Sequence, residues 1–389
     1  MSEKRLVEDY IVDRLIQVKG WRFIESVRLK RDDLGEPLLI PDLIEAIKRI
    51  NSDVELTEGD VNRVLSELKL APANMEGAKT VLRCLKYGTP VKLEKERTVK
   101  NIQLIDYEDL EKNDFVISRQ VSFRGYGEIR ADIILYVNGI PLVLIECKSP
   151  AKPYSTLEEA YAQVKRYERT VPELFKYVQF SITAEWNANY FPNTTEGKET
   201  PQEKWRVEGV EDEVDATIEM LDKATLLDLL GHFIFVREVK GEYTRVMTRW
   251  MQYQATNKIV ERVIKNLKGE DERKNGLIWH WLGSGKTLTM IFTANKLWTL
   301  NIPENPTIFY IVDRIELEEQ LRNEYEALET ALPNLERIES IKELLETLKL
   351  GKRGVFLTLI HKFRPEEIKT LIEELEKLSE STEEETILT

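Results

Sequence analysis

The chain has 389 residues, a formal net charge of −13 at pH 7, 42% hydrophobic residues, two cysteines and three histidines. This length predicts about two domains, and no apolar run is long enough to cross a membrane. The few cysteines exclude a disulfide-stabilised scaffold and favour a reducing cytoplasm, and histidines this far apart do not indicate a zinc site. The acidic charge does not exclude nucleic-acid binding, because local basic patches govern contact with phosphates.

The first hundred residues contain mainly helical patterns. Apolar residues recur at helical spacing over Glu8–Lys19, which predicts a first helix. Residues 38–72 have the start signals of two helices and are predicted to form a helical insert. Two strands are predicted at residues 81–88 and 94–99, on either side of a basic, turn-like segment.

A hairpin of two apolar strands joined at Asn138-Gly139 is the central feature of the sequence. Three charged residues interrupt it: Asp132 near the start of the first strand, and Glu146 and Lys148 near the end of the second. Because side chains alternate along a strand, Glu146 and Lys148 are expected to share one face. Charges at the rim of a buried sheet are costly unless they act together.

The register of the hairpin decides whether the three charges can form one site. A strict two-residue turn would make Asp132 face away from Glu146. One extra residue in the second strand restores Asp132 to a position opposite Glu146, and Pro141 suits a bulge because it cannot donate to the ladder. We therefore predict a β-bulge or an irregular turn near Ile140-Pro141.

Together, Asp132, Glu146 and Lys148 have the chemistry of a metal-dependent phosphodiesterase. Two carboxylates are hard oxygen ligands that suit Mg²⁺ or Mn²⁺, and an ammonium group can hold or deprotonate an attacking water. The pattern Asp, hairpin, Glu-X-Lys resembles the PD-(D/E)xK nuclease superfamily, although Ala131 stands where that pattern often has proline. The alternative is a charged strand end exposed to solvent, which is common.

A helix is predicted over Leu157–Arg169, directly after the second strand. Gln163 and Tyr167 lie one turn apart on one face of it. A Gln-X-X-X-Tyr helix after a Glu-X-Lys strand resembles the RecB-type branch of these nucleases. The resemblance implies that Gln163 and Tyr167 support the active site and touch DNA. A plain surface helix anchored by its tyrosine is the alternative.

The same resemblance extends to further charged residues. Lys165, Arg166 and Arg169 of this helix are expected to contact phosphates. In RecB-type nucleases an N-terminal helix often contributes one more acidic residue to the metal site, which implies Glu8 or Glu3 in this sequence. The alternative that we favour is an ordinary surface glutamate.

The remainder of the first domain alternates between strand, loop and helix patterns. A core strand is predicted at residues 177–182, a long polar loop at 192–217 and a mostly helical segment at 221–236. We predict that residues 1–240 form the endonuclease domain and that residues 241–389 form a second domain.

A phosphate loop is predicted in the second domain. An apolar strand at Gly276–His280 precedes Gly283-Ser284-Gly285-Lys286-Thr287, and a helix follows over Leu288–Leu300. In such a loop the backbone N–H groups cradle phosphates, the lysine reaches the β and γ oxygens and the threonine ligates Mg²⁺. The standard pattern has a glycine five residues before Gly285, where this sequence has His280.

The surrounding segments resemble a superfamily 2 helicase or translocase. Gln252 matches the glutamine that reads adenine in that family, so the resemblance implies that Gln252 binds ATP together with the phosphate loop. A predicted strand at Thr307–Val312 ends in Asp313-Arg314 and looks like motif Ia of that family. Val355–Leu359 is predicted as the next parallel strand, followed by Ile360–Phe363. A generic doubly wound α/β core is the alternative.

The combination of motifs resembles the restriction (R, motor) subunit of type I restriction-modification enzymes. The fold implied is α/β: a restriction-endonuclease-like domain, with a mixed sheet flanked by helices, followed by a partial RecA-like parallel lobe. The function implied is ATP-dependent translocation and metal-dependent cleavage of unmodified double-stranded DNA. Mg²⁺ and ATP are the implied cofactors, and methylation and specificity subunits are the implied partners.

No Asp-Glu-Ala-His motif follows the phosphate loop, because Asp313 is the only aspartate after it. We therefore interpret the sequence as an N-terminal fragment of a longer subunit, with a further strand beginning near residues 386–388, and expect no ATP hydrolysis. Two alternatives remain open. One is an ATP-dependent nuclease of another defence or repair system, and the other is a module that docks on DNA or on partner subunits without activity of its own.

Overall fold

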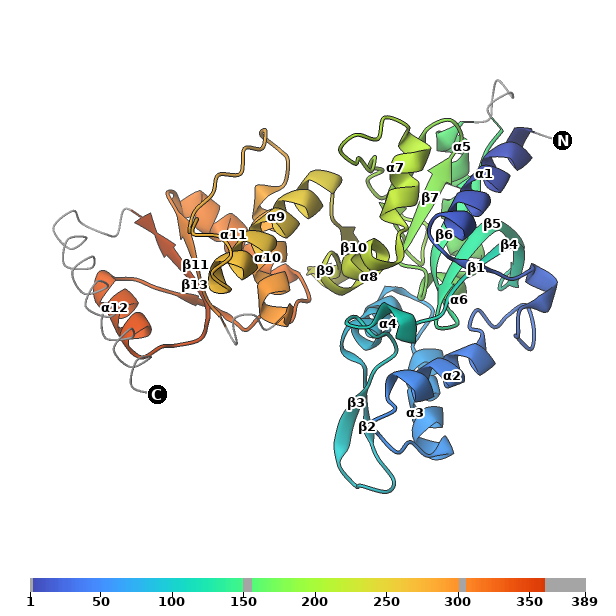
Figure 1. The fold of residues 1–389 in the computed structure, drawn as a ribbon, viewed down its shortest axis with the longest axis horizontal. Coiled ribbons are helices and arrows are strands. Elements are labelled where there is room, and N and C mark those ends of the chain that lie inside the picture. The colour runs from blue at the N-terminus through green and yellow to red at the C-terminus, as the bar shows by residue number, and fades with distance from the viewer. Residues whose placement is uncertain (1–2, 150–155, 301–305, 361–389) are drawn as a thin grey trace. The chain divides into compact units, whose positions relative to one another are not determined.

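The computed structural model describes residues 3–149, 156–300 and 306–360. The chain divides into two compact units, Met1–Trp250 and Met251–Thr389. Figure 1 shows both units. Among the described helices, none has both the length and the apolar character needed to cross a membrane.

The first unit combines one large mixed sheet with helices and two small hairpins (Figure 1). Its elements in chain order are α1 (Glu3–Gln17), β1 (Arg22–Phe23), η1 (Ser26–Arg28), α2 (Ile40–Ile50), α3 (Glu58–Leu70), α4 (Met75–Tyr87), β2 (Thr89–Lys92), β3 (Val99–Ile102), η2 (Leu110–Lys112), β4 (Phe115–Arg124), β5 (Glu128–Val137), β6 (Ile140–Cys147), α5 (Leu157–Thr170), α6 (Pro172–Phe175), β7 (Phe180–Ala184), β8 (Ala188–Pro192), α7 (Glu213–Met220), α8 (Lys223–His232), β9 (Ile234–Val239) and β10 (Glu242–Met247).

The large sheet has the strand order β1-β4-β5-β6-β7-β8. β5 is antiparallel to both β4 and β6, whereas β6 and β7 are parallel because α5 crosses over between them. Tyr161, Val164 and Tyr167 of α5 join the core that includes Ile134 of β5 and Leu144 of β6. This packing holds α5 against the strands that carry the predicted site, and it confirms the predicted mixed sheet flanked by helices.

The turn between β5 and β6 has the two-residue form expected for an Asn-Gly pair. Asn138 and Gly139 both have positive φ, 53° and 79°, as a type I′ turn requires. A Cβ on Gly139 would lie 2.6 Å from the carbonyl oxygen of Leu39, so only glycine fits there. The buried Asn138 side chain donates to the carbonyl of Leu104, which ties the turn to the preceding loop.

The predicted bulge is confirmed in β6. The β5–β6 register shifts just after the proline, and Leu142 is the extra residue without a partner on β5. Beyond the bulge Ile133 pairs with Ile145, which sets Asp132 opposite Glu146.

Helices α2 and α3 confirm the predicted helical insert, but the strand predicted at residues 81–88 is wrong. That segment belongs to α4, which the side chain of Asn74 caps by accepting from the backbone N–H of Gly77. Buried residues recur in α4 at three- and four-residue spacing: Met75, Ala78, Leu82 and Leu85. The neighbouring strands are β2 and β3, so the second strand begins at Val99 rather than at residue 94.

The segment after β8 contains more regular structure than its sequence suggests. The predicted loop at 192–217 ends in α7, which begins at Glu213. The predicted helical segment at 221–236 is right for α8, but β9 begins at Ile234. β9 and β10 form an antiparallel hairpin that belongs to the first unit.

The second unit contains a small parallel sheet and helices. Its described elements are α9 (Trp250–Leu267), α10 (Lys286–Leu300), β11 (Thr307–Val312), α11 (Ile315–Ala327), β12 (Leu335–Arg337), α12 (Ile341–Lys349) and β13 (Gly354–Leu359). The strand order is β11-β13-β12 and all pairs are parallel. The predicted strands at 307–312 and 355–359 and the predicted helix at 288–300 are confirmed.

The strand predicted at Gly276–His280 is wrong, because this segment has no regular secondary structure. Leu277 and Trp279 are 80% and 88% exposed. An apolar segment becomes a strand only when a neighbouring strand pairs with it, and none of β11, β12 and β13 does so. The predicted residues 361–363 and 386–388 lie outside the described residues.

Candidate functional site

Asp132 is buried at the middle of β5, with 3% of its surface exposed. Its Oδ2 accepts a hydrogen bond of 2.9 Å from the backbone N–H of Cys147, and its Oδ1 accepts one of 3.1 Å from Nε2 of Gln120. The first bond ties the carboxylate to β6 at the residue next to Glu146. The register and this contact together bring the two predicted carboxylates to one end of the sheet.

Glu146 and Lys148 lie at the end of β6 and both contact Gln163 of α5. Nε2 of Gln163 donates to Oε1 of Glu146 over 2.6 Å, and Nζ of Lys148 donates to Oε1 of Gln163 over 2.5 Å. Nζ of Lys148 is also 3.5 Å from Oε1 of Glu146. The predicted sharing of one face by Glu146 and Lys148 is therefore confirmed, and α5 covers that face.

Tyr167 completes this group from the next turn of α5. Its hydroxyl accepts from Nε2 of Gln163 over 2.5 Å and donates to the carbonyl oxygen of Arg130 over 3.0 Å. Burial raises the pKa of the Tyr167 hydroxyl, and the negative charge of Glu146 raises it further. The hydroxyl therefore keeps its proton, which holds the amide of Gln163 in one orientation.

Glu8 of α1 lies at the other side of Asp132 and is buried, with 3% exposure. Its carboxylate accepts from Nε of Arg119 over 2.8 Å and from Nε2 of Gln120 over 3.2 and 3.1 Å. The favoured interpretation of Glu8 as a surface residue is wrong, because Arg119 and Gln120 cover it. The side chain of Glu3 lies outside the described part of the chain.

Gln120 is the residue that sequence reasoning missed. Its Nε2 lies within hydrogen-bonding distance of both Glu8 and Asp132, and its backbone has a φ of 51°. This unusual backbone conformation in mid-strand directs its amide between the two carboxylates. The available signal was the adjacent pair Arg119-Gln120, whose long polar side chains interrupt the strand Val116–Phe123.

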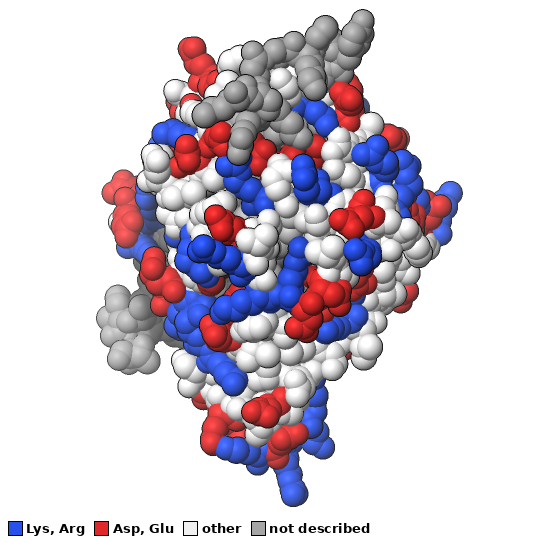
Figure 2. Space-filling view, turned by 90° about the vertical axis from the view of Figure 1, so that its right-hand side faces the viewer, with Lys and Arg blue, Asp and Glu red and all other residues white. Residues whose placement is uncertain are grey.

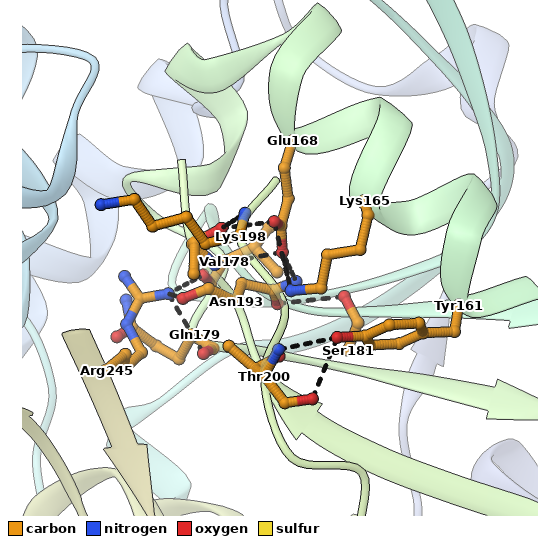
Figure 3. A network of polar contacts seen from close by, with 11 residues as sticks. Tyr161, Lys165, Glu168, Val178, Gln179, Ser181, Asn193, Lys198, Thr200 and Arg245 are labelled. Carbon is orange, nitrogen blue, oxygen red and sulfur yellow. Dashed lines mark hydrogen bonds and ion pairs between the residues drawn. The ribbon is translucent and has the colours of Figure 1, made fainter. Parts of the chain in front are cut away.

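Lys165 does not face solvent, so the expectation that it contacts phosphate is wrong. It is 2% exposed, and its Nζ donates to both carboxylate oxygens of Glu168 over 3.0 and 3.3 Å (Figure 3). Burial lowers the pKa of the Lys165 ammonium, and the charge of Glu168 partly opposes this. Arg166 and Arg169 are exposed, and their contact with phosphates stays a prediction.

The ion pair is part of a larger buried network that anchors α5 (Figure 3). Glu168 also accepts from Nδ2 of Asn193 over 2.9 Å and from the hydroxyl of Thr194 over 2.5 Å. Arg245 of β10 donates to the carbonyl oxygens of Val178 and Asn193 over 2.8 and 3.1 Å. Burial lowers the pKa of Arg245 to about 10. This network links α5, the segment after β8, and β10.

Two carboxylates are the metal-binding groups that this site offers. Over the described residues, no group of three or more His, Cys, Asp or Glu side chains is placed to hold a metal ion. Mg²⁺ keeps several waters and is commonly held by one or two carboxylates. The donor set of Asp132 and Glu146 therefore fits a hard, hydrated cation rather than a structural metal.

The phosphate loop lies before α10, and Gln252 of α9 contacts it. Gly283 and Gly285 have φ angles of 79° and 78°. Nε2 of Gln252 donates to the carbonyl oxygens of Ser284 and Gly285 over 3.3 and 3.1 Å. A Cβ on Gly285 would lie 2.3 Å from that Nε2, so this approach requires glycine. Lys286 and Thr287 are the first two residues of α10, at the helix end that favours anions.

The fold and these two sites define a protein that joins a nuclease-like α/β domain to an ATPase-like α/β domain. The family described as "Type I restriction enzyme R protein N terminus" matches residues 1–200, and the family described as "SWI2/SNF2 ATPase" matches residues 251–388. The chain belongs to the family of type I restriction enzyme R proteins.

Individual relatives agree with this assignment. A putative type I restriction enzyme MjaVIIIP endonuclease subunit of Methanocaldococcus jannaschii is 31% identical over 96% of this chain and 38% of its own length. The MjaVIIP endonuclease subunit of the same organism is 37% identical over 73% of this chain and 29% of its own length. The HindI endonuclease subunit of Haemophilus influenzae is 27% identical over 93% of this chain and 36% of its own length. The chain thus spans only about a third of these relatives.

Proposed function

We propose that this chain carries the DNA-cutting site and part of the ATP-driven motor of a type I restriction enzyme. The proposed reaction is hydrolysis of phosphodiester bonds in unmodified double-stranded DNA, in the cytoplasm, in a complex with methylation and specificity subunits. One observation carries the proposal: Gln163 contacts both Glu146 and Lys148, next to a strand register that sets Asp132 opposite Glu146.

Each residue of the site has a proposed role. Mg²⁺ held by Asp132 and Glu146 would lower the pKa of a bound water and offset charge on the phosphate. Lys148 holds the attacking water and stabilises the charge that develops on the phosphate oxygens. Gln163 aligns Lys148 with Glu146, and Tyr167 fixes the orientation of Gln163.

The second unit is proposed to bind ATP. Its proposed contacts are Gln252 and the loop residues Gly283, Ser284, Gly285, Lys286 and Thr287. Translocation needs a carboxylate that holds Mg²⁺ and orients water, and Asp313 is the only aspartate after the loop. We therefore expect this chain by itself to hydrolyse no ATP.

The test is cleavage of supercoiled DNA by the chain with and without Mg²⁺, followed on gels. We expect cleavage that requires the metal and is unchanged by ATP. Lys148→Ala should lower the rate by about 10²- to 10⁴-fold, the usual contribution of a group that serves the attacking water. Lys92→Ala, which removes an exposed lysine of β2, is the matched control and should cut like the wild type.

Cleavage that persists after chelation of the metal, or that Lys148→Ala leaves intact, would contradict the assignment. DNA binding without any cleavage under metal would instead support the docking module without activity of its own. Circular dichroism of each variant distinguishes a lost site from a lost fold.

A further inference from the structure

The β4–β5 hairpin extends past the end of the site. β5 pairs with β6 as far as Ile133, whereas its pairing with β4 continues to Arg124 opposite Glu128. Asp132 and Glu128 are four positions apart along β5, which corresponds to about 13 Å at about 3.3 Å per residue. A two-stranded arm therefore projects beyond the carboxylates, and residues 124–128 form its tip.

The tip is held rigidly against the end of α5. The backbone N–H of Tyr126 donates to the carbonyl oxygen of Thr170 over 2.9 Å, and that of Gly125 donates to Gly127 over 2.8 Å. A Cβ on Gly125 would lie 2.6 Å from the Thr170 oxygen, so the close approach requires glycine. The same helix thus positions Gln163 in the site and the tip beyond it.

Tyr126 is the most prominent side chain of the tip. Its side chain is 90% exposed. The glycines on either side of it, Gly125 and Gly127, are joined by a backbone hydrogen bond. A large aromatic residue on a well-anchored tip loses little conformational entropy when it binds a partner. Its exposure to water in the free protein is unfavourable, so binding a partner that covers it is favoured. This combination indicates a contact residue rather than a packing residue.

Exposed side chains of both charges lie at and near the tip: Arg124, Arg130 and Arg166 are basic, and Glu128 and Asp33 are acidic. Arg124 is 65% exposed and lies 3.2 Å from Glu128. Arg130 and Arg166 are exposed, and both adjoin Tyr167: Arg166 lies over its ring, and the carbonyl of Arg130 accepts from its hydroxyl. Figure 2 shows blue basic side chains interspersed with red acidic ones across the middle of the face that it draws.

The helix provides a second measure of the separation between site and tip. Thr170 follows Gln163 by seven positions along α5, which corresponds to about 10 Å at about 1.5 Å per residue. The helix and the strand therefore give similar separations between the site and the tip, about 10 Å and about 13 Å. Phosphates of one DNA strand are spaced by about 3.4 Å along the duplex axis. A duplex lying along the arm would therefore meet the tip about three to four nucleotides from the phosphate in the site.

We propose that the β4–β5 tip, with Tyr126, Arg130 and Arg166, is a DNA-contacting arm that holds the duplex beside the cutting site. Arginines bind the phosphates, and the aromatic ring packs on a sugar of the backbone. A protein-docking surface would offer apolar neighbours, whereas the exposed side chains of the arm and of the adjoining part of α5 include Arg124, Arg130 and Arg166. The choice of DNA as the partner rests on the proposed function.

The arm is tested by the affinity for a short fluorescent DNA duplex, measured by fluorescence anisotropy. Every protein also carries Lys148→Ala, so that binding is measured without cleavage. Tyr126→Ala should weaken binding about tenfold, because the contact made by one aromatic ring is lost, and Tyr126→Phe should bind nearly as tightly as the parent. Arg130→Gln should lower the slope of log affinity against log salt by about one. Arg83→Gln, an arginine of α4 that is 50% exposed, is the control and should leave both quantities unchanged.

Cross-linking gives a second measurement, because both native cysteines are buried. Tyr126→Cys labelled with a photoreactive maleimide should cross-link to the duplex, and Leu70→Cys, at a position 82% exposed at the end of α3, should not. Equal cross-linking of the two positions, or an unchanged DNA affinity of Tyr126→Ala, would overturn the proposal. So would a Tyr126→Ala variant that binds a methylation subunit less tightly but binds DNA as before. A chain that binds DNA through the arm but never cuts it would refute the nuclease assignment and leave the arm intact.

Discussion

At the scale of single residues, Gln163 is the point where the site is held together. Its amide nitrogen contacts Glu146 and Tyr167, and its amide oxygen accepts from Lys148. An amide is suited to this position because it donates to a carboxylate and accepts from an ammonium at the same time. Neither a carboxylate nor a hydrocarbon can do both.

The first prediction follows from that hydrogen-bonding pattern. Gln163→Leu should lower the cleavage rate or the apparent affinity for Mg²⁺ by about 10- to 100-fold, the usual effect of losing a group that orients metal ligands. The measurement is the cleavage rate as a function of Mg²⁺ concentration. Glu146 and Lys148 remain in place, so some metal-dependent cutting should persist.

Gln17→Leu is the matched control, because Gln17 is an exposed glutamine at the end of α1. It should leave the Mg²⁺ dependence unchanged. If Gln163→Leu also cut at the wild-type rate with the wild-type Mg²⁺ dependence, Gln163 would be a packing residue only.

At the scale of elements, the position of α5 depends on the buried network beneath it. Lys165 and Glu168 of α5 form an ion pair, and Arg245 of β10 lies where its charge acts on Glu168. The guanidinium of Arg245 donates to backbone carbonyls at the start of β7 and the end of β8. The helix that carries Gln163 and Tyr167 is thereby fixed to the sheet by polar contacts as well as by its apolar face.

Arg245→Met should therefore destabilise the first unit. We expect the free energy of unfolding to fall by about 3 kcal/mol, because the change leaves buried backbone carbonyls without their donor and removes a positive charge that acts on Glu168. Urea denaturation followed by circular dichroism measures this. Lys240→Met in the exposed β9–β10 turn is the control, and it should change the free energy by less than about 0.5 kcal/mol. An equal effect of both changes would show that the network contributes no stability.

At the scale of the whole molecule, buried tyrosines couple stability to alkaline pH. Burial raises the pKa of Tyr136, Tyr177 and Tyr190 above the ordinary value of 10.0. Below that value both the folded and the unfolded chain keep these protons, so the contribution of the tyrosines to stability is complete. Above it the unfolded chain loses protons that the folded chain retains, so stability falls as pH rises.

We therefore expect the free energy of unfolding to decrease above about pH 10, by about 1.4 kcal/mol per pH unit for each such tyrosine. Urea denaturation at several alkaline pH values measures the slope. The Tyr136 hydroxyl makes no hydrogen bond to the described residues, so Tyr136→Phe should fold normally and reduce the slope by one proton. A slope that Tyr136→Phe leaves unchanged would contradict this origin.

Local patterns were enough to predict the hairpin at Asn138-Gly139, its bulge and helix α5. Turn chemistry, the twofold alternation of a strand and the 3.6-residue period of a helix act over a few neighbouring residues, so they are visible in sequence. The shared face of Glu146 and Lys148 follows from the same alternation. These features account for the predicted part of the site.

Contacts between distant segments decided the rest. Glu8 is buried because Arg119 and Gln120 of β4 cover it, more than a hundred positions away in sequence. Lys165 is buried because the segment after β8 closes over α5. The apolar residues at 276–280 form no strand because none of the described strands pairs with them. Burial and strand pairing depend on which element lies alongside, and only the folded chain specifies that.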